Sequence, residues 1–188
     1  MSRIGVVLSG GGARGISHIG VLQALNEFGI FPDIVSGTSA GAFVGALYCE
    51  GIAPKEILEI IRQTNFIRHV RFGYSFKGIL SLEKITVILD KHIPHNTFES
   101  LKIPLVVTAT DIELGKAVRF RNGPLAPAVI ASCSLPGLFV PFQYQGSYYV
   151  DGAIVDNLPV SPIQSESEFI IGVQCNPIPN KKIASNFI

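Results

Sequence analysis

The chain has 188 residues, enough for one domain with a sizeable core, and 47% of them are hydrophobic, with a mean hydropathy of +0.40. The formal net charge of +1 excludes the strongly basic surface of a nucleic-acid binder, so we expect no nucleic-acid partner. The longest stretch without a charged residue, Asn122–Val150, contains four prolines, which excludes a continuous helix across a bilayer.

Short apolar runs alternate with helix-period segments in the first part of the chain. The segment Ala40–Glu50 is apolar almost all round, as expected of a buried helix. Pro54 suits the first position of a helix, where the missing N–H costs little. The pattern predicts two strands, Arg3–Ser9 and Asp33–Ser36, and three helices, Ser17–Phe28, Ala40–Glu50 and Pro54–Asn65.

The rest of the chain carries more strands than helices. The pattern predicts helices over Leu82–Lys91 and Pro127–Cys133, strands over Leu105–Thr110, Ala117–Phe120 and Phe169–Gln174, and a hairpin with arms at Gln143–Tyr144 and Ser147–Val150. Strands that alternate with helices predict an α/β layered domain with a mostly parallel sheet.

A glycine loop follows the first strand in "LSGGGARG". Gly10, Gly12 and Gly15 have the G-x-G-x-x-G spacing of a dinucleotide-binding turn. That fold needs an acidic residue at the end of its second strand, whereas Asp33 stands at the beginning of the strand predicted here. We therefore expect no dinucleotide cofactor. The loop still directs backbone N–H groups at negative charge from the start of a helix.

The second strand is followed by "GTSAG", which is G-x-S-x-G between a strand and a helix. Its glycines permit a sharp turn that exposes the Ser39 hydroxyl at the helix N-terminus. The alternative is an ordinary tight turn. Because adjacent parallel strands end at the same edge of a sheet, Ser39 and the glycine loop are expected to lie together there.

A serine hydroxyl needs a base to become a nucleophile. None of the four histidines follows an acid as late as Asp151, so the order Ser, acid, His of the α/β-hydrolases is excluded for that acid. Asp151 itself, with an ordinary pKa of ~3.9, is ionised at pH 7 and can accept the Ser39 proton directly. The alternative for an Asp-Gly pair is an Asx turn.

Four segments of the chain, taken together and in order, resemble the patatin-like phospholipase family: "GGGARG", "GTSAG", "ASCSLPGLFVP" and "YYVDGAIVDNLPV". The resemblance runs from about Arg3 to Val173. It implies a three-layer α/β/α sandwich with a mostly parallel central sheet. It also implies a Ser–Asp dyad without histidine, in which Ser39 is the nucleophile and Asp151 the general base.

The resemblance further implies an oxyanion hole built from backbone N–H groups of Gly10, Gly11 and Gly12, with Ala40 as a further donor, and it implies no metal and no cofactor. The reaction is then two-step acyl transfer on a lipid or acyl-ester substrate: phospholipid, lysophospholipid or neutral ester. Two alternatives stay open, namely an acyltransferase with the same acyl-serine, and a non-catalytic lipid- or nucleotide-binding module.

Other polar residues near these motifs have simpler interpretations. Arg14 either binds a lipid phosphate or braces the glycine loop. Asp111 follows a strand and is expected to hold the next turn, as is the Asp156-Asn157 pair. His18 is expected to cap or pack the first helix, since no second ligand lies at metal spacing.

The segment "NFIRHVRFGYSFKG", Asn65–Gly78, mixes aromatic and basic residues. Such a mixture suits a lid at a membrane interface, hence peripheral membrane contact, and also suits a surface loop whose aromatic rings fold back on the core. The N-terminus lacks a secretory signal, and the three cysteines form no C-x-x-C pair. We therefore expect free thiols in a reducing, cytoplasmic compartment.

We expect one patatin-like catalytic domain over residues 1–188. Family members often continue with further helices, so the expectation includes either a compact member or a chain that extends beyond Ile188.

Overall fold

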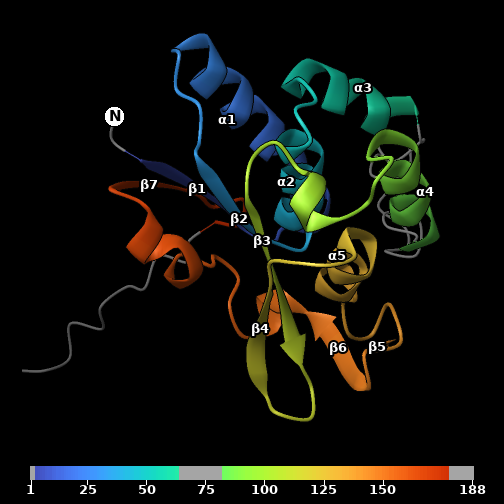
Figure 1. Cartoon of the computed structure of the whole chain (residues 1–188). Helices are drawn as coiled ribbons and strands as arrows, with labels where there is room; N and C mark the ends of the chain where they lie inside the picture. The colour runs from blue at the N-terminus through green and yellow to red at the C-terminus, as the bar shows by residue number, and fades with distance from the viewer. Residues whose placement is uncertain (1–2, 64–81, 178–188) are drawn as a thin grey trace, which may run out of the picture.

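The computed structural model describes residues 3–63 and 82–177, and its centre is one seven-stranded sheet (Figure 1). The strand order is β5-β6-β3-β2-β1-β7, with β4 paired to β3 off this path. The strands are β1 (Ile4–Leu8), β2 (Ile34–Thr38), β3 (Leu105–Asp111), β4 (Lys116–Phe120), β5 (Phe142–Tyr144), β6 (Ser147–Asp151) and β7 (Phe169–Val173).

The sheet is parallel on one side and antiparallel on the other. β7, β1, β2 and β3 run parallel to one another, whereas β4 and β6 are antiparallel to β3, and β5 is antiparallel to β6. The predicted mixed α/β class with a central sheet is confirmed. The parallel description applies to the four strands β7, β1, β2 and β3. Helices connect β1 to β2 and β2 to β3, because consecutive parallel strands need crossover connections.

Helices cover the two faces of the sheet unequally. The α-helices α1 (Ile16–Glu27), α2 (Ala40–Cys49), α3 (Pro54–Gln63), α4 (Leu82–His92) and α5 (Leu125–Cys133) share one face (Figure 1). Val6 and Leu8 of β1 face these helices, and Val7 faces the other way. There, within the described residues, the covering layer is the short 3-10 helix η6 (Ser161–Glu166), whose Ile163 packs in that second cluster.

Helix α2 lies at the centre of the helical layer, and all ten of its residues are buried. Its sequence is apolar almost all round because it contacts the sheet on one side and α1, α3, α4 and α5 on the others. It begins directly after Ser39, which follows the last residue of β2. The helix N-terminus therefore lies at the carboxyl edge of the parallel strands, the edge at which α/β proteins bind ligands.

The predicted elements agree with the observed ones apart from their ends. Strand β2 extends to Thr38, because Gly37 and Thr38 continue the ladder with β3. Helix α5 starts at Leu125, two residues before the predicted start at Pro127. A proline is tolerated in the first turn of a helix, because the N–H groups there have no partner within the helix. The predicted lid, Asn65–Gly78, lies outside the described residues. Among the helices that the structure does describe, none is long and apolar enough to cross a bilayer.

Candidate active site

Ser39 occupies a strained turn between β2 and α2. Its φ of 54° and ψ of −121° lie in a region that non-glycine residues rarely adopt. The glycines on either side make the turn possible. A Cβ on Gly41 would lie 2.2 Å from the carbonyl oxygen of Leu8, and one on Gly37 would lie 2.7 Å from the Gly41 carbonyl carbon. The "GTSAG" segment thus forms the sharp elbow that its spacing predicts.

Asp151 meets the elbow from the end of β6, which pairs with β3. The Ser39 hydroxyl donates a hydrogen bond of 2.6 Å to Asp151 Oδ2, and each residue is only 3% exposed. The other carboxylate oxygen, Oδ1, accepts a hydrogen bond of 2.8 Å from the Ala153 amide. The geometry is compatible with both interpretations of the Asp-Gly pair, since one carboxylate oxygen faces the serine while the other closes the turn.

The environment of Asp151 favours a stronger base than a free aspartate. Burial raises its pKa, because the charged form loses water, and the hydrogen bonds from Ser39 and Ala153 act in the opposite direction. A carboxylate with a raised pKa accepts a proton more readily, which suits a general base that works on a hydroxyl.

The glycine loop lies beside Ser39, and its amides are not equivalent. The Gly10 N–H donates to the Asn157 carbonyl at 3.1 Å, so it is occupied within the fold. The N–H groups of Gly11, Gly12 and Ala40 have no acceptor among the described residues. The expected set of oxyanion donors is thereby narrowed to these three, and Gly10 serves to anchor the loop.

Two residues that follow β7 form hydrogen bonds with the start of the glycine loop. The Cys175 amide donates to Ser9 Oγ at 3.0 Å, and Asn176 Nδ2 donates to the Gly10 carbonyl at 3.3 Å. His18 is fully buried, and its Nε2 lies 2.8 Å from the Ser9 carbonyl oxygen. Burial lowers the pKa of His18, against the opposing effect of this hydrogen bond. His18 is thus a buried packing residue of the first helix, as expected, and its hydrogen bond connects that helix to the residue before the glycine loop.

Of the two other aspartates, Asp111 holds the next turn, as expected, whereas the Asp156 side chain forms an ion pair with β4. Asp111 Oδ1 accepts hydrogen bonds of 2.9 Å from the amides of Glu113 and Leu114. Asp156 pairs with Arg119 of β4 at 2.6 Å, and its carbonyl oxygen accepts from Thr38 Oγ1 at 2.9 Å. The segment that follows Asp151 is therefore tied both to β4 and to the end of β2, next to the elbow.

Sequence reasoning missed Ser132, which supports the elbow. Its hydroxyl accepts a hydrogen bond of 2.7 Å from the Ser39 amide and donates one of 2.6 Å to the Thr108 carbonyl on β3. Ser132 is fully buried. The serine lies within the quoted "ASCSLPGLFVP" segment, but nothing in that spacing indicates which of its two serines contacts the elbow.

Replacing Ser132 by alanine is expected to slow acylation of Ser39 about 10- to 100-fold, because a small displacement of a nucleophile is enough for such a loss. The Ser39 amide and the Thr108 carbonyl would lose their partner, lowering the free energy of unfolding by about 1–3 kcal/mol. Fluorophosphonate labelling rates and urea unfolding measure the two effects. Ser134→Ala is the control, since the buried Ser134 hydroxyl donates to the Ile130 carbonyl within its own helix turn and not to the elbow. Equal labelling by both variants would contradict a role for Ser132.

A pocket of about 430 Å³ opens above Ser39 and Asp151. The residues that line it differ in chemistry. The polar part consists of the glycine loop, Arg14 and the amide side chains of Asn157 and Asn176, whereas Cys133, Leu135, Leu138 and Phe139 form an apolar wall. Burial and the nearby Asp151 charge raise the pKa of Cys133, so its thiol stays neutral and acts as part of the apolar wall.

Arg14 is exposed at this pocket, and its Nη1 donates to Asn176 Oδ1 at 2.9 Å. No carboxylate pairs with it in the described part of the chain. Residues 3–63 and 82–177 also contain no group of three or more side chains placed to hold a metal ion.

The fold and site define a mixed α/β domain with a buried Ser–Asp pair at the carboxyl edge of its sheet. The family model described as patatin-like phospholipase matches residues 6–163. The chain belongs to the patatin-like phospholipase family.

Several relatives named for the NTE family match the chain. An uncharacterized NTE family protein of Mycobacterium tuberculosis is 36% identical over 177 residues, which are 93% of this chain and 49% of that protein. A lysophospholipase NTE1 of Cryptococcus neoformans is 36% identical over 86% of this chain and 10% of its own length. The chain thus spans half or less of these relatives. In fold, it is similar to VipD of Legionella pneumophila, with a TM-score of 0.58, 21% identity, and coverage of 84% of this chain and 47% of VipD.

Proposed function

We propose that this chain is a serine hydrolase that cleaves fatty-acyl esters of lipids through an acyl-serine intermediate. The observation that carries the proposal is the 2.6 Å hydrogen bond between Ser39 Oγ and Asp151 Oδ2 at a pocket with an apolar wall. Membership of the patatin-like phospholipase family supports it, as does the relative named a lysophospholipase.

The first half of the proposed reaction forms the acyl-enzyme. Asp151 Oδ2 takes the hydroxyl proton while Ser39 Oγ attacks the ester carbonyl carbon. The oxyanion of the tetrahedral intermediate accepts hydrogen bonds from the free amides of Gly11, Gly12 and Ala40. The carbon–oxygen bond to the leaving alcohol then breaks, and that alcohol receives the proton from Asp151.

The second half releases the fatty acid and restores the enzyme. Asp151 takes a proton from a water molecule, and the resulting hydroxide attacks the acyl-serine carbonyl carbon. The same amides stabilise the second oxyanion, at about 3 kcal/mol for a single donor. When that intermediate collapses, the fatty acid leaves and Ser39 Oγ receives the proton from Asp151.

The pocket suggests how a lipid would be oriented in it. The acyl chain would lie along the apolar wall of Leu135, Leu138 and Phe139, which removes methylene groups from water. The Arg14 guanidinium, which no carboxylate neutralises among the described residues, would face the phosphate of the substrate.

Replacing Arg14 by alanine is expected to raise KM for a lysophospholipid about tenfold and to leave the KM for a neutral monoacylglycerol near that of the wild type, since a charged hydrogen bond contributes about 1.5–3 kcal/mol. Steady-state kinetics on the two substrates measures the difference. A role confined to bracing the loop predicts equal losses with both substrates, and such a result would contradict phosphate binding.

Turnover of phospholipid, lysophospholipid and neutral esters of increasing chain length tests the proposed function. Free fatty acid is the expected product with each accepted substrate. A second run with an added alcohol acceptor separates hydrolysis from transfer, since a transferase would yield a new ester in its place. Absence of turnover on every ester, with Ser39 unreactive toward fluorophosphonate, would contradict the proposal.

A further inference from the structure

Two short segments border the pocket and then expose apolar side chains. Leu138 and Phe139 line the pocket, and the next residue, Val140, is 82% exposed. In the same way Ala153 lines the pocket, and Ile154, which follows it, is 57% exposed. A hydrogen bond of 2.9 Å links the two stretches of chain: the amide of Asp151, two residues before Ala153, donates to the carbonyl of Ser134, four residues before Leu138.

The loop that carries Val140 has a defined shape. The amides of Leu138 and Phe139 both donate to the Leu135 carbonyl, at 3.2 and 3.0 Å, and Pro136 forms a bridge with Phe139. This turn directs Phe139 toward the pocket and leaves Val140 on the outside. Val140 is therefore held in water by the fold, although burial of its side chain would be favourable.

Two charged side chains line the pocket, Arg14 and Asp151. No Asp, Glu, Lys or Arg occurs between Asn122 and Val150, so the loop carries no charge. Of the next two carboxylates, Asp151 is buried at Ser39, and Asp156 is paired with Arg119. On the glycine-loop side the exposed Arg14 lines the pocket without a carboxylate partner among the described residues.

We infer that Val140 and Ile154, the apolar rim, insert into the surface of a lipid aggregate while Arg14 meets its anionic headgroups. The inference rests on the proposed function, because a lipid whose ester must reach Ser39 would then enter the pocket directly from that surface. Exposed apolar side chains together with Arg14, which no carboxylate pairs with among the described residues, match an anionic lipid interface. A second copy of the chain would place two Arg14 cations near one apolar contact, so a lipid surface fits the charges better.

Vesicle binding of the full chain tests the rim directly. Cosedimentation is measured with two kinds of vesicle, one of phosphatidylcholine alone and one of equal parts phosphatidylcholine and phosphatidylserine. All variants carry Ser39→Ala, so that the lipid is not hydrolysed during the measurement. Val140→Asp and Ile154→Asp are each expected to weaken binding at least about tenfold, because each removes an apolar anchor and adds an anion. The wild-type rim is expected to bind the vesicles that contain phosphatidylserine more tightly.

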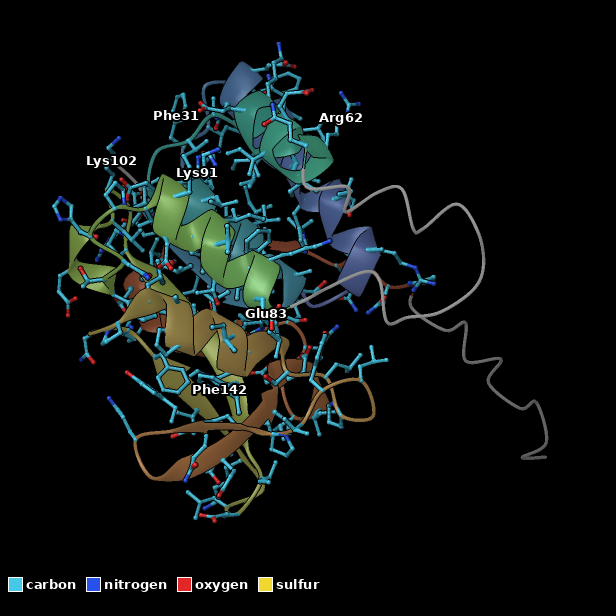
Figure 2. The ribbon with its side chains drawn as sticks, turned by 90° about the vertical axis from the view of Figure 1, so that its right-hand side faces the viewer. Phe31, Arg62, Glu83, Lys91, Lys102 and Phe142 are labelled. Carbon is cyan, nitrogen blue, oxygen red and sulfur yellow. The ribbon has the colours of Figure 1, made fainter. Side chains whose placement is uncertain are left out.

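Phe28→Asp is the matched control. Phe28 is 83% exposed, nearly the same as Val140, and follows α1 at the edge of the sheet opposite Ser39. Phe31, three residues beyond Phe28, lies near the top of the molecule in Figure 2, and Phe142, two residues beyond Val140, lies in its lower half. The Phe28→Asp variant is expected to bind vesicles with the same affinity as the protein with an unchanged rim. Val140→Thr, which keeps the side-chain shape, supplies a milder variant should aspartate disturb folding.

Hydrolysis of a water-soluble short-chain ester, measured with Ser39 intact, keeps the two proposals apart. The rim variants are expected to cleave this ester at the wild-type rate, whereas an inactive wild type would overturn the proposed function alone. Unchanged vesicle binding in both rim variants, or an equal loss of binding in Phe28→Asp, would contradict the proposal that the rim inserts into lipid. So would light scattering that shows a wild-type dimer which Val140→Asp converts to monomer without a change in vesicle binding.

Discussion

Replacing Ser39 by alanine is expected to lower ester hydrolysis by at least about 10⁴-fold and to abolish labelling by a fluorophosphonate probe. Without the hydroxyl the enzyme cannot form an acyl-serine, and only the weak effect of the oxyanion hole on direct attack by water would remain. Probe labelling followed by peptide mass analysis identifies the modified residue, and fatty-acid release measures turnover.

The Ser134→Ala variant is the control for this experiment as well. Ser134 is a buried serine near the elbow, and its hydroxyl donates to the Ile130 carbonyl at 2.8 Å and takes no part in the pair with Asp151. It is expected to keep the wild-type labelling pattern. Equal labelling of wild type and Ser39→Ala would place the reactive group elsewhere and contradict the proposed nucleophile.

Replacing Asp151 by asparagine is expected to lower turnover about 10²- to 10⁴-fold, the range that a general base contributes. Asparagine fits the geometry, because its Oδ1 can accept from the Ala153 amide while its Nδ2 donates to Ser39 Oγ. It cannot take the serine proton. The loss should therefore appear in kcat, with little change in substrate binding.

The same substitution is expected to stabilise the fold at neutral pH. Burial raises the folded-state pKa of Asp151 above its unfolded value. Below the unfolded pKa both states hold the proton, and the group has no effect on stability. As pH rises toward the folded pKa, the unfolded state loses the proton first, so wild-type stability falls, and the deficit persists at higher pH. Asparagine has no such deficit, so its melting temperature should exceed the wild-type value at pH 7 and approach it in acid.

Wild-type activity should depend on the same ionisation. Only the carboxylate can accept the Ser39 proton, so turnover is expected to fall as pH decreases through the raised pKa of Asp151. Asp111→Asn is the control, since Asp111 is also 3% exposed and its Oδ1 holds the amides of Glu113 and Leu114. It is expected to remain active. A comparable loss of kcat in this variant would attribute the Asp151 effect to damage of the fold.

Much of the architecture follows from local chemistry that the sequence states by itself. Apolar runs of strand length and a helix apolar on all sides are visible as patterns, since burial on both faces leaves no polar position. The elbow at Ser39 was predictable for a similar reason. Its flanking glycines approach the backbone of β1 and of the helix so closely that other residues would collide. The sequence also determined the family, through motifs whose order is specific.

The tertiary structure decided what each polar group faces. The Ser39 amide bonds to a hydroxyl 93 positions away, and no periodicity connects Ser39 with Ser132. Gly10 and Gly11 look equivalent in "SGGGARG", but the carbonyl of Asn157, which follows β6 in the chain, accepts a hydrogen bond from the Gly10 amide alone. Likewise the β5–β6 hairpin and the strand β4 were predicted, whereas the antiparallel pairing of β6 with β3 joins residues about 40 positions apart and depends on the tertiary fold. Hydrogen-bond partners depend on which chain segments meet, and a linear pattern records only what each residue can bind.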